Sequence, residues 1–241
     1  MALGSAVHEV LESLSNLPTE DRFKTSLVER FDQAWQKVSG PMGGFADEAT
    51  EANYKNRGED MLRRVMAHPG PLAQKAVKIN ADLPQYWISE EDNLILCGKI
   101  DWLEYIEENN SVRILDFKTG VGEESVDSLQ LPIYYLLAHN CQTRDVTGAS
   151  YWYIARDDFP VEKKLPDLDK SKELVMKVGK EMKLARQLER FKCPEGDAGC
   201  KYCTPYEKII RGEAVYVGTG EYGSDVYVVS ESVKKMDSKI L

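Results

Sequence analysis

Apolar side chains recur at helical spacing in the first third of the chain. In residues 3–14 they stand at every third or fourth position, which predicts an amphipathic helix. The same spacing predicts two further helices at 20–38 and 46–67. Glycine and proline between 40 and 44 and between 69 and 71 separate and end them. A helix that begins this close to the first residue suggests that the chain is a piece cut from a longer one.

The pattern then changes to short runs rich in β-branched and aromatic residues. Residues 76–88, 93–106 and 112–118 are expected to be strands. The polar stretches "EEDN" (90–93) and "EENN" (107–110) read as turns between them. Together these segments predict an antiparallel meander with tight connections.

Helical and extended patterns alternate after the meander. Residues 125–139 and 168–191 are expected to be helices, and 149–156 a strand. The segment "DVYVV" (225–229) predicts an edge strand. The fold class expected from this order is α/β (α+β), with a central mixed sheet that contains a β-meander and is flanked by helices.

Composition narrows the class of protein. The 241 residues are 42% hydrophobic and 29% charged, as in globular domains, and no apolar run is long enough for a membrane span. Glu9 and Glu12 stand where a signal peptide would be basic, so the cytoplasm is the expected compartment. A net charge of −9 argues against non-specific coating of nucleic acid. However, residues 89–127 are acidic and 162–192 are basic, which suits a cation site beside a surface for a polyanion.

Two carboxylates and a lysine stand in segments that otherwise look buried. Asp116 and Lys118 share one face of the predicted strand, and pairing with the strand of Asp101 would bring the carboxylates together. Converging carboxylates repel unless a cation separates them, and hard oxygen ligands suit Mg²⁺ or Mn²⁺. Two carboxylates that hold a metal ion, together with a lysine that stabilises negative charge, suit metal-assisted phosphodiester hydrolysis. The alternative is that both acids cap strand ends and Lys118 is a solvated partner.

Four ordered segments carry a family resemblance. "GKID" (98–101) and "ILDFKTG" (114–120) resemble the metal-binding strands of the RecB-like branch of the PD-(D/E)xK nuclease superfamily, which includes helicase-linked and Cas4-type proteins. "LGSAVHEVLE" (3–12) resembles the upstream histidine helix of that branch, and "LQLPIYYLL" (129–137) its Q-x-x-x-Y helix. "YKNRGEDML" (54–62) is a weaker match.

The resemblance implies a role for each matching residue. His8, Asp101, Asp116 and the backbone carbonyl of Phe117 would hold the divalent metal ion. Lys118 would position or activate the attacking water. Gln130 and Tyr134, four residues apart on one helix face, would support the site or contact DNA, with packing on the sheet as an equal alternative. Pro132 predicts that their helix begins near Leu129.

The resemblance also implies the domain organisation. A restriction-endonuclease-like core would occupy residues 1–210, followed by a C-terminal tail at 211–241. Within the core we expect N-terminal helices at 1–70, the catalytic sheet and helices at 71–192, and a cysteine loop at 193–204.

Three of the five cysteines lie in this loop. Cys193, Cys200 and Cys203 include a C-x-x-C spacing typical of metal sites. Many relatives bind a 4Fe–4S cluster with one cysteine before the histidine helix and three near the C-terminus. Here no cysteine precedes His8, and Ile209 and Ile210 stand where a last cysteine is expected. A cluster, a zinc site and a reduced loop without metal all remain open.

The other two cysteines are expected to be thiols. Cys97 reads as a small buried hydrophobic residue, and Cys141 as an unpaired thiol.

The leading functional hypothesis is a Mg²⁺- or Mn²⁺-dependent deoxyribonuclease, with an exonuclease favoured, in a helicase–nuclease, repair, recombination or CRISPR-adaptation system. DNA would be its substrate, a helicase or another nuclease-complex subunit a partner, and the basic helix at 168–192 a DNA-facing surface. An alternative is a DNA-binding or assembly module that keeps the fold without cleaving. A partner-dependent subunit, fused to or docked on a helicase, is a third hypothesis.

Overall fold

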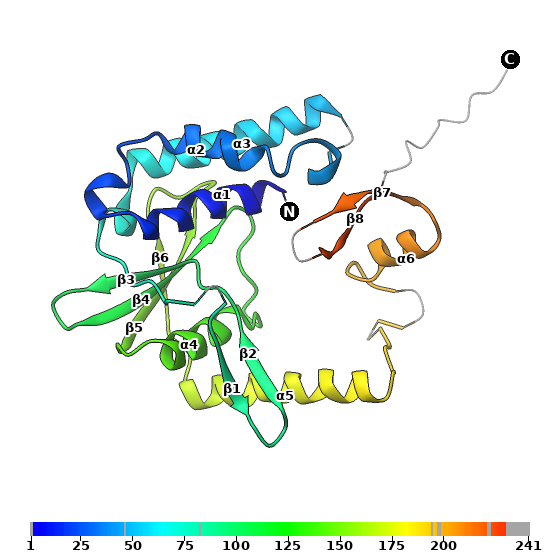
Figure 1. Ribbon diagram of the computed structural model, residues 1–241. Helices are drawn as coiled ribbons and strands as arrows, with labels where there is room; N and C mark the ends of the chain where they lie inside the picture. The colour runs from blue at the N-terminus through cyan, green and yellow to red at the C-terminus, as the bar shows by residue number, and fades with distance from the viewer. Residues whose placement is uncertain are drawn as a thin grey trace, which may run out of the picture.

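The computed structural model describes residues 2–45, 47–81, 83–193, 195–196, 199–220 and 223–229. Its N-terminal part is helical, as expected (Figure 1). The helices are α1 (Ala2–Ser13), η1 (Leu14–Asn16), η2 (Thr19–Asp21), α2 (Leu27–Trp35), η3 (Gly40–Gly43), α3 (Glu48–Ala67) and η4 (Gly70–Ala73). None of the helices in the described ranges is long and apolar enough to span a membrane.

The second helix is shorter than its apolar pattern predicted. The chain forms only the 3-10 turn η2 near residue 20, and α2 begins at Leu27. Ser26 caps this start, because its hydroxyl accepts a hydrogen bond from the backbone N–H of Val28 at 3.3 Å. The side chain of Arg22, which lies between the two helices, is buried.

A mixed four-stranded sheet forms the centre. Its strands are β3 (Trp102–Ile106), β4 (Ser111–Lys118), β5 (Val146–Tyr153) and β6 (Val161–Lys163), in that spatial order. β4 pairs antiparallel with β3 and parallel with β5, and helix α4 (Gln130–Cys141) makes the parallel connection. The expected mixed sheet flanked by helices is confirmed; the short edge strand β6 was not predicted.

The expected three-stranded meander was wrong. β1 (Gln85–Ser89) and β2 (Leu94–Cys97) form a separate two-stranded sheet, and the chain between Gly98 and Asp101 leaves the strand conformation. A Cβ atom at Gly98 would lie 3.0 Å from the Leu137 side chain, so the break passes tightly over α4. Cys97 is exposed, contrary to expectation, because its strand lies outside the central sheet.

Among the described residues of the first expected strand, only one pairs with the central sheet. Ala76 forms an isolated antiparallel bridge with Glu104, flanked by backbone hydrogen bonds to Leu103 and Tyr105. The rest of 76–84 contains no described strand, and Pro84, which has no N–H to donate, ends this stretch.

Alternating side chains of the central strands enter two cores. Trp102, Leu115 and Phe117 pack with the N-terminal helices, whereas Leu103 and Ile114 pack toward α4. This alternation fixes the face of β4 that carries Asp116 and Lys118, which is the face that α4 covers. A third cluster joins α4 to β1 and helix α5 (Leu168–Gln187).

The C-terminal part forms small elements of its own. Helix α6 (Thr204–Ile210) follows the cysteine loop, and β7 (Ala214–Thr219) pairs with β8 (Asp225–Val229). β8 contains the expected edge strand, and it pairs only with β7 within the described residues. The hairpin contacts α6 and η3, which places it beside the N-terminal helices (Figure 1). Residues 230–241, part of the expected tail, lie outside the described residues.

Candidate active site

The residues singled out in the sequence converge from four elements. His8 projects from α1, Asp101 directly precedes β3, Asp116 and Lys118 end β4, and Gln130 begins α4. α4 begins one residue after the position that Pro132 indicated, and the proline occupies its first turn. The structure brings these side chains together in two adjoining groups, one around His8 and one around Asp116.

The first group contains a histidine and two carboxylates. His8 Nδ1 lies 3.4 Å from Asp101 Oδ2 and 3.5 Å from Glu12 Oε1. Burial alone would lower the pKa of His8, but the carboxylates of Asp101 and Glu12 outweigh burial and raise the pKa to about 10. His8 is therefore protonated at neutral pH, and its positive charge offsets the two acids together with that of Lys99, which pairs with Glu12.

The backbone of β4 holds Asp101 in place. The N–H of Phe117 donates a hydrogen bond of 2.9 Å to Asp101 Oδ2, and only 8% of Asp101 is exposed. The ring of Phe117 lies edge-on to the His8 imidazole, with 6.1 Å between the ring centroids. Phe117 thus links the strand that carries Asp116 to the helix that carries His8.

The second group is a network around Asp116. Gln130 Nε2 donates to Asp116 Oδ1 at 2.9 Å and to the Tyr134 hydroxyl at 3.2 Å. Lys118 Nζ donates to Gln130 Oε1 and lies 2.8 Å from Glu124 Oε2. Gln130 therefore bridges the acid, the lysine and the tyrosine, so its side chain does more than pack on the sheet.

Asp116 has the most unfavourable environment for a charge in this network. It is 1% exposed, and burial together with the charge of Asp101 raises its pKa to about 7, although Lys118 acts in the opposite direction. Lys118 Nζ lies 2.9 Å from Asp116 Oδ2 but outside hydrogen-bonding geometry. No described residue donates a hydrogen bond to this buried oxygen.

Lys118 remains a cation in this setting. Burial would lower its pKa, but Glu124 and Asp116 outweigh burial and raise the pKa. The ammonium group also lies 4.9 Å from the centroid of the Tyr151 ring. Burial and the nearby Asp101 raise the pKa of Tyr134, so its hydroxyl stays protonated.

Sequence reasoning missed two acidic residues of the site. Glu12 stands four positions after His8 on the same face of α1, and this spacing could have identified it. Glu124 reaches Lys118 from the loop between β4 and α4, where no periodic pattern marks a position. Lys99 pairs with the second oxygen of Glu12 at 2.5 Å.

The donor set fits a divalent cation. One ligand atom each from His8, Glu12 and Asp101 lies within 4.8 Å of the others. The buried oxygen of Asp116 that lacks a hydrogen-bond donor lies in the adjoining network. Carboxylate oxygens with one imidazole nitrogen suit Mg²⁺ or Mn²⁺ and leave positions open for water and substrate.

If His8 is a ligand, its replacement should reduce metal binding more than folding. We expect His8→Ala to weaken Mn²⁺ binding at least about tenfold, because even outer partners of metal ligands contribute that much. Alanine is well accepted within a helix, so the melting temperature without metal should change little. Calorimetric titration with Mn²⁺ and thermal melts measure both quantities, with the exposed His139→Ala as control. A collapsed melting temperature and unchanged Mn²⁺ binding would instead make His8 a core residue.

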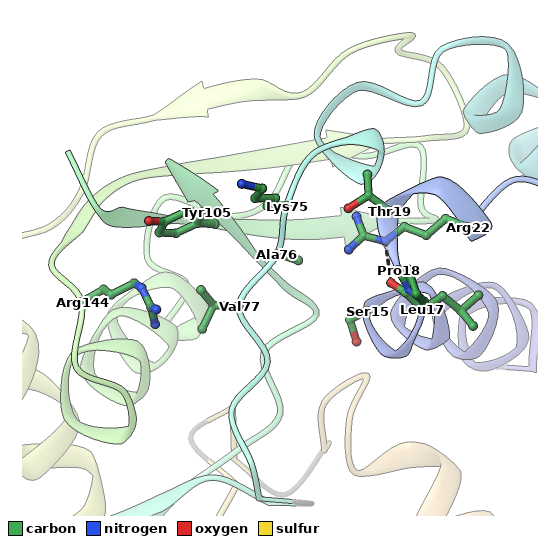
Figure 2. Close-up of a pocket in the computed structure, with 10 residues that line it drawn as sticks. All are labelled: Ser15, Leu17, Pro18, Thr19, Arg22, Lys75, Ala76, Val77, Tyr105 and Arg144. Atoms are coloured by element: carbon green, nitrogen blue, oxygen red, sulfur yellow. Dashed lines mark hydrogen bonds between the residues drawn. The ribbon is translucent and has the colours of Figure 1, made fainter. Parts of the chain in front are cut away.

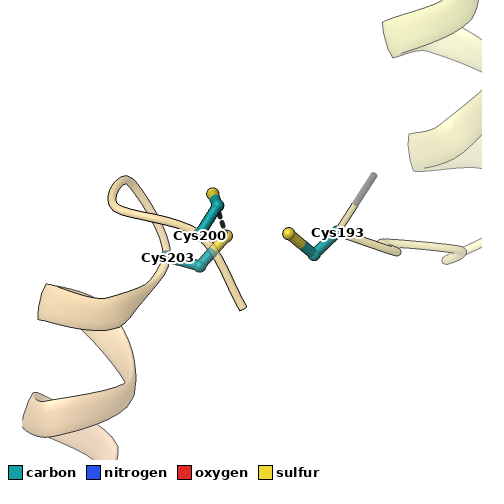
Figure 3. Close-up of side chains that lie close together, drawn as sticks. All are labelled: Cys193, Cys200 and Cys203. Carbon is teal, nitrogen blue, oxygen red and sulfur yellow. Dashed lines mark hydrogen bonds between the residues drawn. The ribbon is translucent and has the colours of Figure 1, made fainter. Parts of the chain in front are cut away.

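The loop before α6 forms a second cluster, made of thiols. Sγ atoms of Cys193, Cys200 and Cys203 lie within 4.8 Å of one another, with 3.7 Å between the last two (Figure 3). Backbone N–H groups of Cys203 and Tyr202 lower the pKa of Cys200, whereas the adjacent Cys200 and desolvation raise that of Cys203 to about 11. A thiolate stabilised by backbone amides is a ready metal ligand. The described residues supply three ligands, one fewer than structural zinc or cluster sites use.

Comparison with known proteins agrees with this geometry. The family model of the PD-(D/E)XK nuclease superfamily matches residues 1–208. No curated protein and no solved structure matches the chain. Nucleases of this superfamily use divalent metal ions, as the donor set around His8 would require. Since the match covers most of the chain and includes every residue of both groups described above, this protein belongs to the PD-(D/E)XK nuclease superfamily.

Proposed function

We propose that the protein is a metal-dependent DNA nuclease of the RecB-like branch, which hydrolyses phosphodiester bonds. The observation that carries the proposal is the position of Lys118. Its partly buried ammonium group lies between Asp116 and Glu124, and Gln130 of α4 links it by hydrogen bonds to Asp116, which adjoins the His8 group. Membership of a nuclease superfamily supports the same reaction class.

His8, Asp101, Asp116 and the backbone carbonyl of Phe117 are the proposed metal ligands, and Glu12 is an additional one. A bound Mg²⁺ or Mn²⁺ would polarise the scissile phosphate and lower the pKa of a bound water.

The protein's own groups would position the substrate and offset its charge. Lys118 carries a permanent positive charge that can orient an attacking water and stabilise the negative charge of the transition state. Gln130 fixes the relative positions of Asp116 and Lys118 through its two amide atoms. Tyr134, held by Gln130, offers a protonated hydroxyl at the edge of the network.

A non-cleaving DNA-binding module with the same fold is the alternative. Such a module has no use for Asp116, whose raised pKa means that its charge destabilises the fold at neutral pH. Salt-dependent DNA binding without any metal-dependent product would favour this alternative.

We favour an exonuclease over an endonuclease, on the resemblance to the RecB-like branch. The purified chain should degrade linear end-labelled DNA in the presence of Mn²⁺ and leave covalently closed circular DNA intact. Cleavage of the circular substrate at an equal rate would identify an endonuclease. The same resemblance supports a partnership with a helicase in repair, recombination or CRISPR adaptation. The excess of basic residues in 162–192 supports the lysine-rich α5 as a DNA-facing helix.

The cysteine cluster is proposed as a structural metal site, either iron–sulfur or zinc. A brown protein with bound iron and sulfide would identify a cluster, and a colourless protein with about one equivalent of zinc would identify zinc. A colourless, metal-free protein would leave a reduced loop.

Loss of one thiolate should loosen the C-terminal elements if the cluster binds metal. We expect Cys203→Ser to reduce metal content and to lower the melting temperature, because metal binding and folding are coupled. Cys141→Ser, a thiol on α4 away from the cluster, is the matched control. Metal analysis and thermal melts give the result, and equal melting of the two variants together with equal metal content would refute a metal site.

A further inference from the structure

A polar pocket, separate from the residues proposed for catalysis, lies at the outer edge of the central sheet. It encloses about 300 Å³ between η1, η2, the segment 75–77 and the end of β3. This volume is at the lower end of small-ligand sites. Tyr105, which lines the pocket, is four residues beyond Asp101, about 13 Å along an extended strand.

One wall of the pocket holds a buried cation without a carboxylate partner. Arg22 is 3% exposed, and its guanidinium group donates to backbone carbonyls of Leu14, Leu17, Leu72 and Gln74. The group also lies 4.9 Å from the centroid of the Trp102 ring. No acid in the described ranges forms an ion pair with Arg22. Carbonyls satisfy its hydrogen-bond donors but leave its charge uncompensated, and burial lowers its pKa accordingly.

Two further cations complete the lining. Arg144 stacks over Tyr105, with its guanidinium carbon 5.3 Å from the ring centroid. Lys75 belongs to the segment 75–77, which lies between Arg144 and Arg22 (Figure 2). Figure 2 shows the guanidinium groups of Arg22 and Arg144 approaching the segment 75–77 from opposite sides. Lys75 pairs with Glu107, but that acid is on the exposed rim and does not line the pocket.

The lining has the donors of an anion site. Thr19 contributes a hydroxyl with no hydrogen-bond partner among the described residues, and none of the lining residues is acidic. The three cations make the lining positive in a chain with a net charge of −9, and within the described residues only Lys75 among them pairs with an acid, on the exposed rim. A phosphate group has enough acceptor oxygens to take hydrogen bonds from the Arg144 guanidinium, the Lys75 ammonium and the Thr19 hydroxyl, and enough charge to offset the uncompensated charge of Arg22 nearby.

We propose that this pocket binds a phosphate group at a site separate from the catalytic one. The phosphate belongs either to the backbone of a nucleic-acid strand that continues past the catalytic residues, or to a free phosphate compound. The first source rests on the proposed function, whereas the second does not.

The test neutralises two rim cations and leaves Arg22, which holds four backbone carbonyls, untouched. Lys75→Gln/Arg144→Gln is compared with Lys55→Gln/Arg63→Gln, which removes the same charges from α3, where both residues are paired with acids. In one arm, melting temperatures are measured in inorganic phosphate and in chloride of equal ionic strength. In the other arm, a single-stranded oligonucleotide is titrated in EDTA, so that no cleavage is needed.

We expect the Lys75/Arg144 variant to bind the strand about tenfold more weakly than the control variant, with the slope of log K against log salt reduced by about 1. A phosphate-specific rise in melting temperature that this variant loses identifies a site open to free phosphate. An effect in the strand arm alone identifies a backbone phosphate. Equal behaviour of both variants in both arms would overturn the proposal. A phosphate effect in a protein that cuts no DNA would support the pocket while refuting the nuclease.

Discussion

Replacing Asp116 with asparagine should reduce DNA cleavage by roughly a thousandfold or more, on the scale of the loss of a principal transition-state group. The same substitution should leave the melting temperature of the metal-free protein unchanged or raise it. Asparagine is isosteric and can still accept the hydrogen bond from Gln130. What the substitution removes is a negative charge that is buried next to Asp101.

The stability effect follows from the raised pKa of Asp116. Its ordinary value of 3.8 rises to about 7 in the fold, so the unfolded chain loses the proton more readily than the folded one. The free energy of unfolding is therefore highest, as far as Asp116 is concerned, below about pH 4, and it falls as the pH rises toward 7. At neutral pH the fall is on the order of 4 kcal/mol. Asparagine removes this loss, and the missing contact with Lys118 offsets part of the gain.

Asp127→Asn is the matched control, because Asp127 is exposed just before α4 and belongs to neither group. It should cleave and melt like the parent protein. Gel assays of end-labelled DNA and thermal melts in EDTA give both quantities. Cleavage at the parental rate by Asp116→Asn would refute a role of Asp116 in the reaction. A large fall in melting temperature would show that its carboxylate supports the fold.

Lys118→Gln should reduce cleavage about a hundredfold to a thousandfold and, unlike Asp116→Asn, should destabilise the protein. Removing one partner from a buried ion pair leaves the other charges uncompensated, here Asp116 and Glu124, at a cost of about 3 kcal/mol. For a chain of this size we expect a melting temperature lower by about 6–12 °C.

A double variant separates the two roles of Lys118. Adding Asp116→Asn to Lys118→Gln should recover stability, because the acid that lost its cation is then neutral, but it should not recover cleavage. Lys163→Gln is the control, since Lys163 also lies over the Tyr151 ring, 5.4 Å from its centroid, but outside the network. If Lys118→Gln retained parental activity, the lysine would be only a structural counter-charge.

Local patterns in the sequence predicted the elements that carry the site. The apolar spacing around His8 gave α1, and Pro132 placed the start of α4 to within one residue. The alternation of residues 114–118 placed Asp116 and Lys118 on one face of β4. These features depend on the local periodicity of helices and strands, which a single sequence records directly.

Tertiary packing decided what the sequence did not predict. Residues 93–106 look like one strand, but the chain breaks at Gly98 because it must pass over α4 before it enters the central sheet. The contact of Glu124 with Lys118 depends on the course of a loop that carries no pattern. The same break explains why Cys97, which was expected to be buried, is exposed: its strand β2 does not continue into the central sheet.

Cleavage in the presence and absence of metal tests the central claim most directly. End-labelled single- and double-stranded DNA is incubated with the parent protein and with Asp116→Asn, each in Mg²⁺, in Mn²⁺ and in EDTA. The account predicts products from the parent protein with at least one of the two metals, none in EDTA, and cleavage by Asp116→Asn that is slower by roughly a thousandfold or more with either metal. Cleavage that persists in EDTA, or that Asp116→Asn performs as well as the parent, would contradict a metal-dependent nuclease built on this site.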